Sequence, residues 1–225
     1  SARANDGSAK PELAIDSSAL GGMYAGAIKL VGTEGGVGVK LAGNMAASGG
    51  DIQIDANGHL TLAQTSAVGA VNVKAASLDA QGPVYAGTAL NVQTQGNLTS
   101  QKTLAARDSI ALSSGGVLTN SGIIEAGVNA DNSRNAAGDV SLNAQNLTNS
   151  KSVVASRNLT VNAIQTLSNQ NGTLSAGQIA DITAGTLDNQ NNGRVLSSAA
   201  LNVTANQVLN THGLINSTGD LTGTL

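Results

Sequence analysis

A short apolar-x-apolar unit recurs along this chain about every 20 residues, and no other feature limits its fold as strongly. The first residues of successive units are Ile52, Val71, Leu90, Ile110, Val140, Leu159, Ile179 and Leu201, and Asp220 opens one more. Subtracting successive positions from Ile52 to Leu201 gives steps of 19, 19, 20, 30, 19, 20 and 22 residues. Self-similarity with such a period is typical of solenoid proteins, in which each repeat packs only against its neighbours.

Two further apolar units follow within each repeat. The second comes seven or eight residues after the first and begins at Leu78, Leu98, Leu118, Leu147, Leu167, Leu187 and Val208. The third follows after another turn and begins at Val84, Leu104, Ile123, Val153, Leu174, Val195 and Leu214. All three units alternate apolar and polar residues, and Asn, Gly, Ser and Asp separate them. This pattern predicts three short strands joined by turns in each repeat.

Leucine-rich repeats have a similar period, but each of their repeats pairs a strand with a helical or 3₁₀ return. Here helical spacing is not sustained anywhere, and the second and third units alternate as strands do. Each of the few small apolar side chains in a coil stabilises it by only roughly 1.5–3 kcal/mol. This total does not offset the conformational entropy lost on ordering the coil, so a single coil cannot fold alone. Stacking gives every strand hydrogen-bond partners above and below. The repeat therefore predicts an all-β fold, a parallel β-helix of three-strand coils.

The composition agrees with a narrow interior. The 225 residues include two Tyr but no Phe, Trp or Cys, and the hydrophobic fraction is 40%. No apolar stretch approaches the length of about 18 residues that spans a membrane, so we expect no transmembrane segment. Only 11% of the residues are charged, the formal net charge is −3, and no basic cluster occurs. We therefore expect no nucleic-acid partner.

The first unit of each coil supplies the expected core, because its two apolar residues lie on one side of a strand. These inward positions are Ile52, Ile54, Val71, Val73, Leu90, Val92, Ile110, Leu112, Val140, Leu142, Leu159, Val161, Leu201 and Val203.

One turn position carries Asn in five successive coils. The series is Asn120, Asn149, Asn169, Asn189 and Asn210, whereas earlier coils place Ala80 and Ser100 there. Stacked Asn side chains can pass amide hydrogen bonds along a solenoid, so we expect a structural Asn ladder. The alternative is that Asn is simply a favourable turn residue.

Two features interrupt or decorate the repeat. The 30-residue step contains surplus residues 128–138, which we expect to form a loop leaving one coil at little entropic cost. Such a loop is either a recognition element or inert, and the sequence leaves both open.

Tyr24 and Tyr85 stand in similar four-residue motifs before a strand, which predicts one repeat position filled twice.

Little in the sequence indicates chemistry. The acids are scattered, and Asp51, Asp139 and Asp220 each precede a strand, where we expect them to mark turns. His59 and His212 occupy different places in the repeat, so no set of metal ligands is expected. Some parallel β-helices degrade polysaccharides, but such sites need paired carboxylates and aromatic platforms. We therefore expect no catalytic residue, metal or cofactor, and retain a polysaccharide-degrading enzyme only as a lesser alternative.

Two stretches near the start carry a family resemblance. They are Leu20-Gly21-Gly22-Met23-Tyr24-Ala25-Gly26 and Thr33-Glu34-Gly35-Gly36-Val37-Gly38-Val39. They resemble the end of the secretion domain in filamentous-haemagglutinin-like exoproteins. The sequence of residues 118–122 resembles the haemagglutinin repeats of the same family. The resemblance implies a right-handed β-helix, export by two-partner secretion through an outer-membrane transporter, and relatedness to the stems of contact-dependent growth-inhibition toxins. The absence of Cys suits such export, because no early disulfide locks the chain.

The expected organisation follows from this resemblance. Residues 1–50 would be the end of the secretion domain with the first coils, and residues 51–225 the repeats of the stalk. No Asn-Pro motif of the early secretion domain occurs and no toxin-like domain is visible, so we expect a segment of a longer protein. Its expected function is a structural stalk of a secreted or bacterial cell-surface adhesin or toxin-delivery exoprotein, with a receptor or glycan bound elsewhere in the full-length protein. The alternative is a module that itself binds a glycan or receptor.

Overall fold

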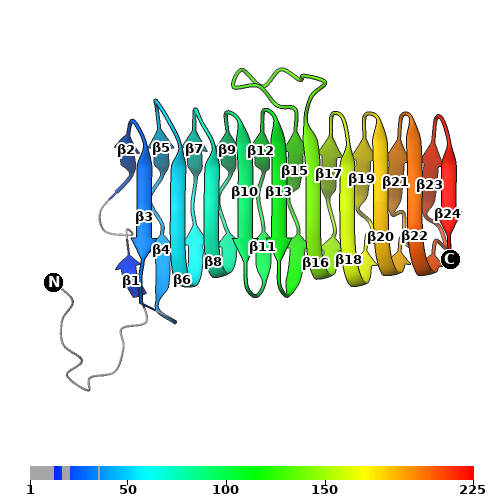
Figure 1. The fold of residues 1–225 in the computed structure, drawn as a ribbon, viewed down its shortest axis with the longest axis horizontal. Helices are drawn as coiled ribbons and strands as arrows, with labels where there is room; N and C mark the ends of the chain where they lie inside the picture. The colour runs from blue at the N-terminus through cyan, green and yellow to red at the C-terminus, as the bar shows by residue number, and fades with distance from the viewer. Residues whose placement is uncertain (1–12, 17–20, 35) are drawn as a thin grey trace.

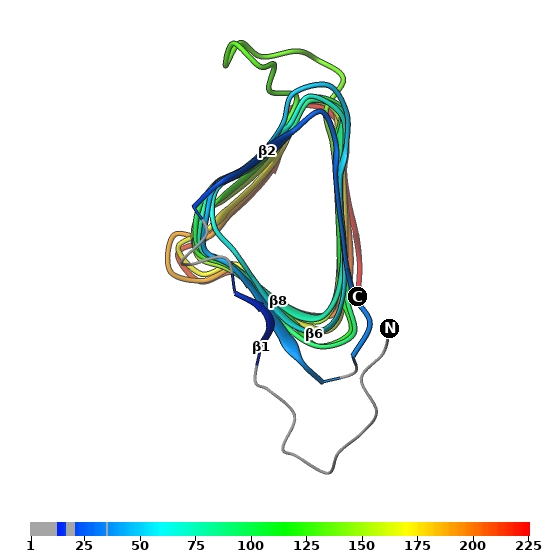
Figure 2. The ribbon, with the colours of Figure 1, turned by 90° about the vertical axis from the view of Figure 1, so that its left-hand side faces the viewer.

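The computed structural model describes residues 13–16, 21–34 and 36–225. Leu20 and Gly35 of the two resemblance stretches lie outside the described residues. The described chain is a single solenoid whose strands run parallel to one another (Figure 1). Seen along its axis, each coil is a triangle (Figure 2). From the N-terminal end the chain turns clockwise as it recedes, so the β-helix is right-handed.

The three sides of the triangle are called faces I, II and III. Six strands bend at the corner between faces I and II and contribute to both; they are β6 (Ile52–Leu62), β8 (Val71–Ala80), β16 (Asp139–Asn149), β18 (Leu159–Ser168), β20 (Ile179–Asp188) and β22 (Ala200–Leu209). Face I is completed by β3 (Ile28–Gly32), β10 (Ala89–Thr94), β13 (Ser109–Ser114) and β24 (Leu221–Thr224). Face II is completed by β1 (Leu13–Asp16), β4 (Gly38–Leu41), β11 (Leu98–Ser100) and β14 (Val117–Asn120).

Face III is a separate sheet of short strands. In order along the axis they are β2 (Met23–Ala25), β5 (Met45–Ala47), β7 (Thr65–Ala67), β9 (Val84–Ala86), β12 (Leu104–Ala106), β15 (Ile123–Ala126), β17 (Ser152–Ala155), β19 (Thr173–Ala176), β21 (Arg194–Ser197) and β23 (Leu214–Ser217). The ten strands of this sheet correspond to about ten coils. The predicted all-β, right-handed parallel β-helix of three-sided coils is confirmed. The difference is that the first two strands of a coil often form one continuous bent strand.

Apolar side chains of successive coils stack in columns inside the triangle. Ile52 pairs with Val71, Val71 with Leu90, and Leu90 with Ile110, so one inward position continues from coil to coil. Every expected core residue from Ile52 to Val203 is at most 6% exposed. Face III adds small residues such as Ala86, Ala106 and Ala126, which are fully buried. Small side chains fit because the sides of the triangle lie close together.

One expected strand unit is displaced by a residue. Ala180, not Ile179, pairs with Leu159, and Ile179 is 39% exposed. The cause lies in the preceding corner between faces II and III. Three residues, 170–172, follow Asn169 there, whereas two residues, 150–151, follow Asn149. The added residue delays the next strand by one position and so moves the inward place from Ile179 to Ala180.

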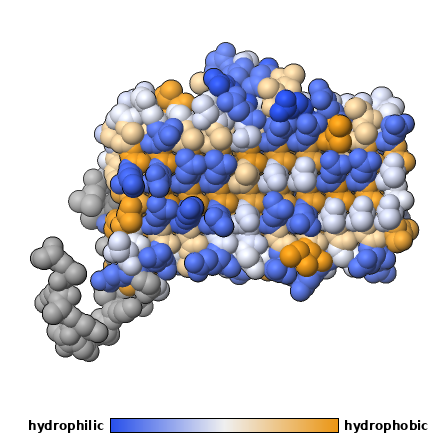
Figure 3. Space-filling view, in the orientation of Figure 1, coloured by the Kyte–Doolittle hydropathy of each residue, from blue (hydrophilic) through white to orange (hydrophobic). Residues whose placement is uncertain are grey.

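The outer surface is polar and regular. On face I, Figure 3 shows rows of hydrophilic residues that run along the axis, with apolar atoms visible between the rows. Residues 127–138 depart from this regularity, because they project at the corner between faces III and I (Figures 1 and 2). This projection matches the position of the expected loop at 128–138.

Candidate functional site

The Asn series lines the corner between faces II and III. Asn120, Asn149, Asn169 and Asn189 are fully buried, and Asn210 is partly buried. The side-chain Nδ2 of each donates to Oδ1 of the next. The distances are 2.8 Å from Asn120 to Asn149 and 2.7 Å for the three later pairs. The structure therefore brings all five residues into one continuous chain of side-chain hydrogen bonds.

Each ladder amide also binds main-chain carbonyl groups. Asn169 Nδ2 donates to the carbonyl of Gly172 in its own corner and to that of Arg194 in the next coil. Asn189 Nδ2 repeats this arrangement with Gly193 and Leu214. Among the described residues, no buried side-chain nitrogen or oxygen is left without a hydrogen-bond partner. The ladder thus satisfies carbonyl groups that the turn leaves outside the strand ladders.

The same position changes character along the axis. The paired residues preceding Asn120 are Leu41, Leu62, Ala80 and Ser100, in that order. The corners lengthen beside the last ladder residues, where Asn171, Asn191, Asn192 and His212 adopt positive φ. Asn is enriched in this left-handed conformation, because its short side chain can bond locally. Leu41, Leu62 and Ala80 therefore close this corner with apolar packing, Ser100 closes it with a hydroxyl bonded to the Lys102 carbonyl, and the later coils close it with amides.

The projecting loop has an ordered internal structure. Val128 and Arg134 form an antiparallel bridge, and Asn132 turns the chain with a φ of 63°. Asp131 Oδ1 accepts from the backbone N–H of Ser133 at 2.9 Å and from its hydroxyl at 2.6 Å. These bonds hold the pKa of the Asp131 carboxyl below its ordinary value. The loop therefore has a defined conformation held by its own hydrogen bonds.

The loop folds back over face III toward earlier coils. The Tyr85 hydroxyl donates to the carbonyl of Val128 at 3.2 Å, across a sequence separation of 43 residues. Arg134 Nε and Nη2 donate to the two carboxylate oxygens of Glu125 at 2.5 and 3.0 Å. Between the loop and face III lies a groove of about 470 Å³. Tyr85 is thus the point where a repeat position and the insertion meet.

The electrostatics around Tyr85 keep its hydroxyl protonated. Burial raises its pKa above the ordinary value of 10.0, and the nearby Asp108 and Asp131 raise it further, while Arg107 opposes them. Tyr24 stands in the same outward column three strands earlier, through Ala46 and Ser66. Tyr24 is 72% exposed. The two tyrosines do fill one repeat position, but the insertion contacts only the second.

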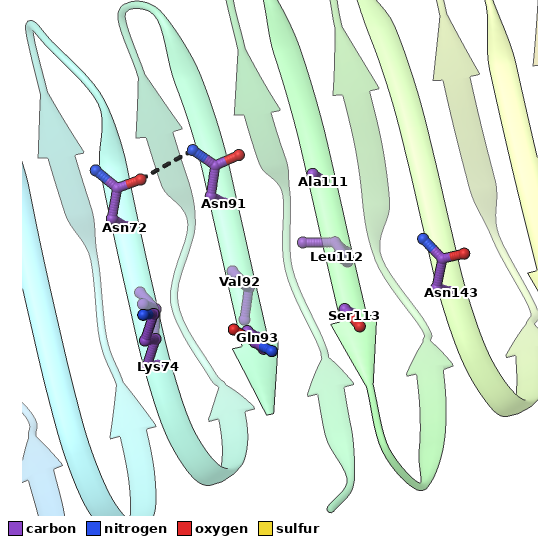
Figure 4. Close-up of a pocket in the computed structure, with 10 residues that line it drawn as sticks. Asn72, Lys74, Asn91, Val92, Gln93, Ala111, Leu112, Ser113 and Asn143 are labelled. Carbon is purple, nitrogen blue, oxygen red and sulfur yellow. Dashed lines mark hydrogen bonds between the residues drawn. The ribbon is translucent and has the colours of Figure 1, made fainter. Parts of the chain in front are cut away.

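A second hollow lies on face I. Its volume is about 260 Å³, and it forms where Ala111 and Ser113 replace the longer Asn91 and Gln93 of the preceding coil. Figure 4 shows Asn72 and Asn91 side by side at its edge, and Asn91 Nδ2 donates to Asn72 Oδ1 at 2.8 Å. Leu112 points to the interior, whereas Ser113 lies on the surface (Figure 4). The hollow is shallow and arises from small side chains, without an aromatic ring or an ion pair.

Two of the three acids that precede a strand support turns. Asp51 Oδ1 accepts from the N–H of Ala70 at 2.8 Å in the next coil. Asp139 accepts from Arg157 Nε and Nη2 at 2.8 and 2.5 Å, and the N–H of Asn158 adds a bond of 3.1 Å. The hydrogen bond from Arg157 lowers the pKa of Asp139, although partial burial works against it. Asp220 lies at the same repeat position and is exposed.

The histidines do not meet. His59 shares a hydrogen bond of 2.8 Å between its Nδ1 and the Ser77 hydroxyl on face II, while His212 sits in the last corner with a φ of 58°. In the part of the chain that the structure describes, no three His, Asp or Glu side chains converge on a common point that could hold a metal. Within residues 13–16, 21–34 and 36–225 there is also no helix with the length and hydrophobicity needed to span a bilayer.

Sequence reasoning missed the residues that build the groove. Arg134 and Glu125 give no motif, because they come from a loop and a strand with no fixed spacing. The one available signal was Tyr85, which lies on face III two coils before the strand that the surplus residues follow. Only the direction in which the loop folds reveals the contact.

Comparisons with known proteins place this solenoid among long bacterial proteins. The chain is 38% identical to the 16S rRNA endonuclease CdiA of Enterobacter cloacae subsp. cloacae over 185 residues, which cover 81% of this chain and 5% of that protein. It is also 38% identical to the tRNA nuclease CdiA of Yersinia mollaretii over 153 residues, covering 67% of this chain and 5% of that protein. A stretch of 57 residues, 25% of this chain, is 58% identical to Toxin CdiA of Yersinia pestis and covers 2% of it.

The chain thus spans about 5% of the length of the relatives that it matches over most of its own length. No solved structure matches it. The haemagglutinin repeat matches residues 1–64, 66–135, 135–191 and 180–224, which together are nearly the whole chain. The repeat sequence, the right-handed β-helix and the similarity to CdiA proteins all indicate the same family. The chain therefore belongs to the haemagglutinin-repeat family of filamentous-haemagglutinin-like exoproteins.

Proposed function

We propose that this chain is a stalk segment of a long secreted or cell-surface exoprotein, and that it holds a distal adhesive or toxic region away from the producing cell. The observation that carries this proposal is the unbroken stacking of about ten coils around one core. Each interior strand has parallel partners on both sides, as β18 has β16 and β20. Such a solenoid resists bending and extends by about 4.8 Å with every added coil.

The proposal also covers the organisation and the partner. Residues 1–50 would close the secretion domain, and residues 51–225 would form the first part of the stalk. The chain would reach the cell surface through an outer-membrane transporter, as the resemblance to two-partner secretion proteins implies. Each coil that emerges could use the previous coil as a template, because the exposed strand edges already define its register. Stacking would then favour outward movement without another energy source.

A non-catalytic role is part of this proposal. The names of the matched relatives describe a 16S rRNA endonuclease, a tRNA nuclease and a toxin, and this chain aligns with 5% or less of each of those proteins. Asp51 and Asp139 support turns. We propose that any toxic activity of the full-length protein resides outside this segment.

The test is surface display on intact producing cells. An epitope inserted between Ala136 and Ala137 would occupy an exposed part of the loop, and we expect the coils to stay intact. We expect an antibody to label intact cells that express the transporter, and to lose at least nine-tenths of that signal when the transporter gene is removed. A periplasmic marker that stays unlabelled serves as the control for membrane integrity. Labelling that persists without the transporter would contradict the secretion route, and a tag found only inside intact cells would contradict the surface role.

A further inference from the structure

The groove beneath the insertion loop has a floor built from two outward columns of face III. One column consists of Gln64, Pro83, Thr103 and Ile123, and the other of Ser66, Tyr85, Ala105 and Glu125. The columns come from β7, β9, β12 and β15, so the floor runs along the axis for roughly 14 Å at about 4.8 Å per coil. The loop closes one side through Val128, Asn132 and Arg134. Figures 1 and 2 show this loop leaning over face III.

The floor is apolar at its centre and polar at its edges. Pro83, the Tyr85 ring and Ile123 supply its large apolar groups, Thr103 lies between Pro83 and Ile123 in their column, and Ile123 is 43% exposed. Gln64, Asn132 and the Glu125–Arg134 pair surround these residues with amide, guanidinium and carboxylate groups. A volume of about 470 Å³ falls within the range of ligand pockets, roughly 300–1,000 Å³. An apolar centre with polar edges suits a ligand that has a C–H face and a rim of hydroxyl groups.

The charges of the groove favour a neutral ligand. Both donors of Arg134 that face Glu125 are already bound to its carboxylate, and the Glu125 side chain is only 18% exposed. Around Tyr85, Arg107 is paired with Asp108 and Arg134 with Glu125, whereas Asp131 bonds to Ser133 and forms no ion pair among the described residues, so one negative charge is left over. A sulfated or sialylated group would meet this charge without a free arginine to offset it. A neutral hydroxyl-rich ring meets no such repulsion.

The backbone of the floor argues against a bound peptide strand. Peptides that bind to sheets usually pair with a free edge through main-chain hydrogen bonds. Here β9 already pairs with β7 and β12, and β15 already pairs with β12 and β17. The floor therefore offers side chains and not a sheet edge.

We propose that this groove binds a short neutral segment of an oligosaccharide, with one sugar ring packed on Tyr85 and the hydroxyl groups of successive sugars bonded to Gln64, Asn132 and the Glu125–Arg134 pair. The Tyr85 hydroxyl holds the loop through Val128, while the ring supplies the platform. The site goes beyond the stalk role and does not depend on it, because a stalk without the groove would still project its distal region.

The test uses the 225-residue chain on an array that carries neutral, sialylated and sulfated glycans. We expect reproducible binding to neutral glycans and at least a tenfold loss of that signal in Tyr85→Ala. Tyr24→Ala is the matched control, because Tyr24 fills the same column far from the loop, and its signal should equal that of the unmodified chain. Circular dichroism and thermal unfolding of each variant show that the coils remain folded.

A second pair of variants keeps the test decisive if Tyr85→Ala loosens the loop. Ile123→Asp places a charge on the groove floor, and Leu214→Asp makes the same change at the equivalent position of β23, where the exposure is also 43%. Only Ile123→Asp should abolish neutral-glycan binding. The proposal is overturned by no binding of any neutral glycan, by binding confined to sialylated or sulfated glycans or to peptides, or by equal effects within each matched pair.

Discussion

Asn169 donates a hydrogen bond of 2.7 Å from its Nδ2 to Oδ1 of Asn189, and both side chains are fully buried in adjacent coils. The bond repeats on either side, so amide groups replace apolar packing at this corner in the later coils. Buried amides are costly when unpaired and stabilising when every donor and acceptor is used. The ladder therefore makes each coil depend on the coil before and after it.

Replacing Asn169 by Leu keeps the branching at Cγ but removes the amide and enlarges the side chain. Asn189 Oδ1 and the carbonyl groups of Gly172 and Arg194 would each lose a donor. We expect the free energy of unfolding to fall by about 3 kcal/mol, measured by urea denaturation. Asn162→Leu, on the exposed surface of the same strand region, should change it by less than about 0.5 kcal/mol. Equal stability of Asn169→Leu and the unmodified chain would show that the ladder does not hold the corner.

The core prediction concerns Val161, which is 1% exposed and pairs with Leu142 and Ile182 in the adjacent coils. Val161→Asp places a carboxylate between apolar columns with no group to pair with it. We expect a loss of about 4 kcal/mol or more and unfolding of at least the neighbouring coils. Asn162→Asp adds the same charge one residue away on the outer surface and should unfold at nearly the unmodified temperature. Unchanged thermal unfolding of Val161→Asp would contradict the inward assignment.

The long corners need Gly beside the ladder. A Cβ atom on Gly193 would lie 2.5 Å from the carbonyl oxygen of Asn169 and 2.5 Å from Oδ1 of Asn189. Gly193→Ala should therefore destabilise the chain by about 2 kcal/mol, because the ladder must shift to make room. Gly26→Ala is the control, since a Cβ there meets nothing within 4 Å. If calorimetry gives the same melting temperature for both variants, the corner has more room for a Cβ atom than these distances indicate.

The Asp139–Arg157 pair predicts a dependence of stability on pH. The hydrogen bond from Arg157 depresses the pKa of Asp139 in the folded chain below the ordinary value of 3.8. The stabilisation is therefore complete above the unfolded-state pKa and is lost as the pH falls through the folded-state value. Asp139→Asn should lower the melting temperature near pH 6, and its difference from the unmodified chain should shrink toward about pH 3.

Asp220→Asn provides the comparison for this series. Asp220 occupies the same repeat position but is exposed on the last coil. Its melting temperature should stay close to that of the unmodified chain at both pH values. A deficit of Asp139→Asn that grows as the pH falls would contradict the assigned direction of the pKa shift.

Much of the fold follows from the sequence because the repeat acts at every coil. The spacing of Ile52, Val71 and Leu90 already defines which side chains face inward, and the Asn series marks one corner. The displacement of Ile179 was not predictable, because it depends on one added residue in a corner whose Gly and Asn residues have no strict period. The groove could not be predicted from the sequence either. Most of residues 128–138 are small or polar, and nothing in them indicates that Val128 meets Tyr85.

The most direct measurement is small-angle X-ray scattering of the 225-residue chain, with circular dichroism beside it. Ten coils at about 4.8 Å each predict a rod of roughly 48 Å with high β content. Removing residues 159–179 deletes one coil in register, since Leu159 pairs with Ala180. We expect the rod to shorten by about 5 Å with an unchanged cross-section. A compact or helical particle, or a deletion that changes the cross-section or unfolds the chain, would contradict the stalk.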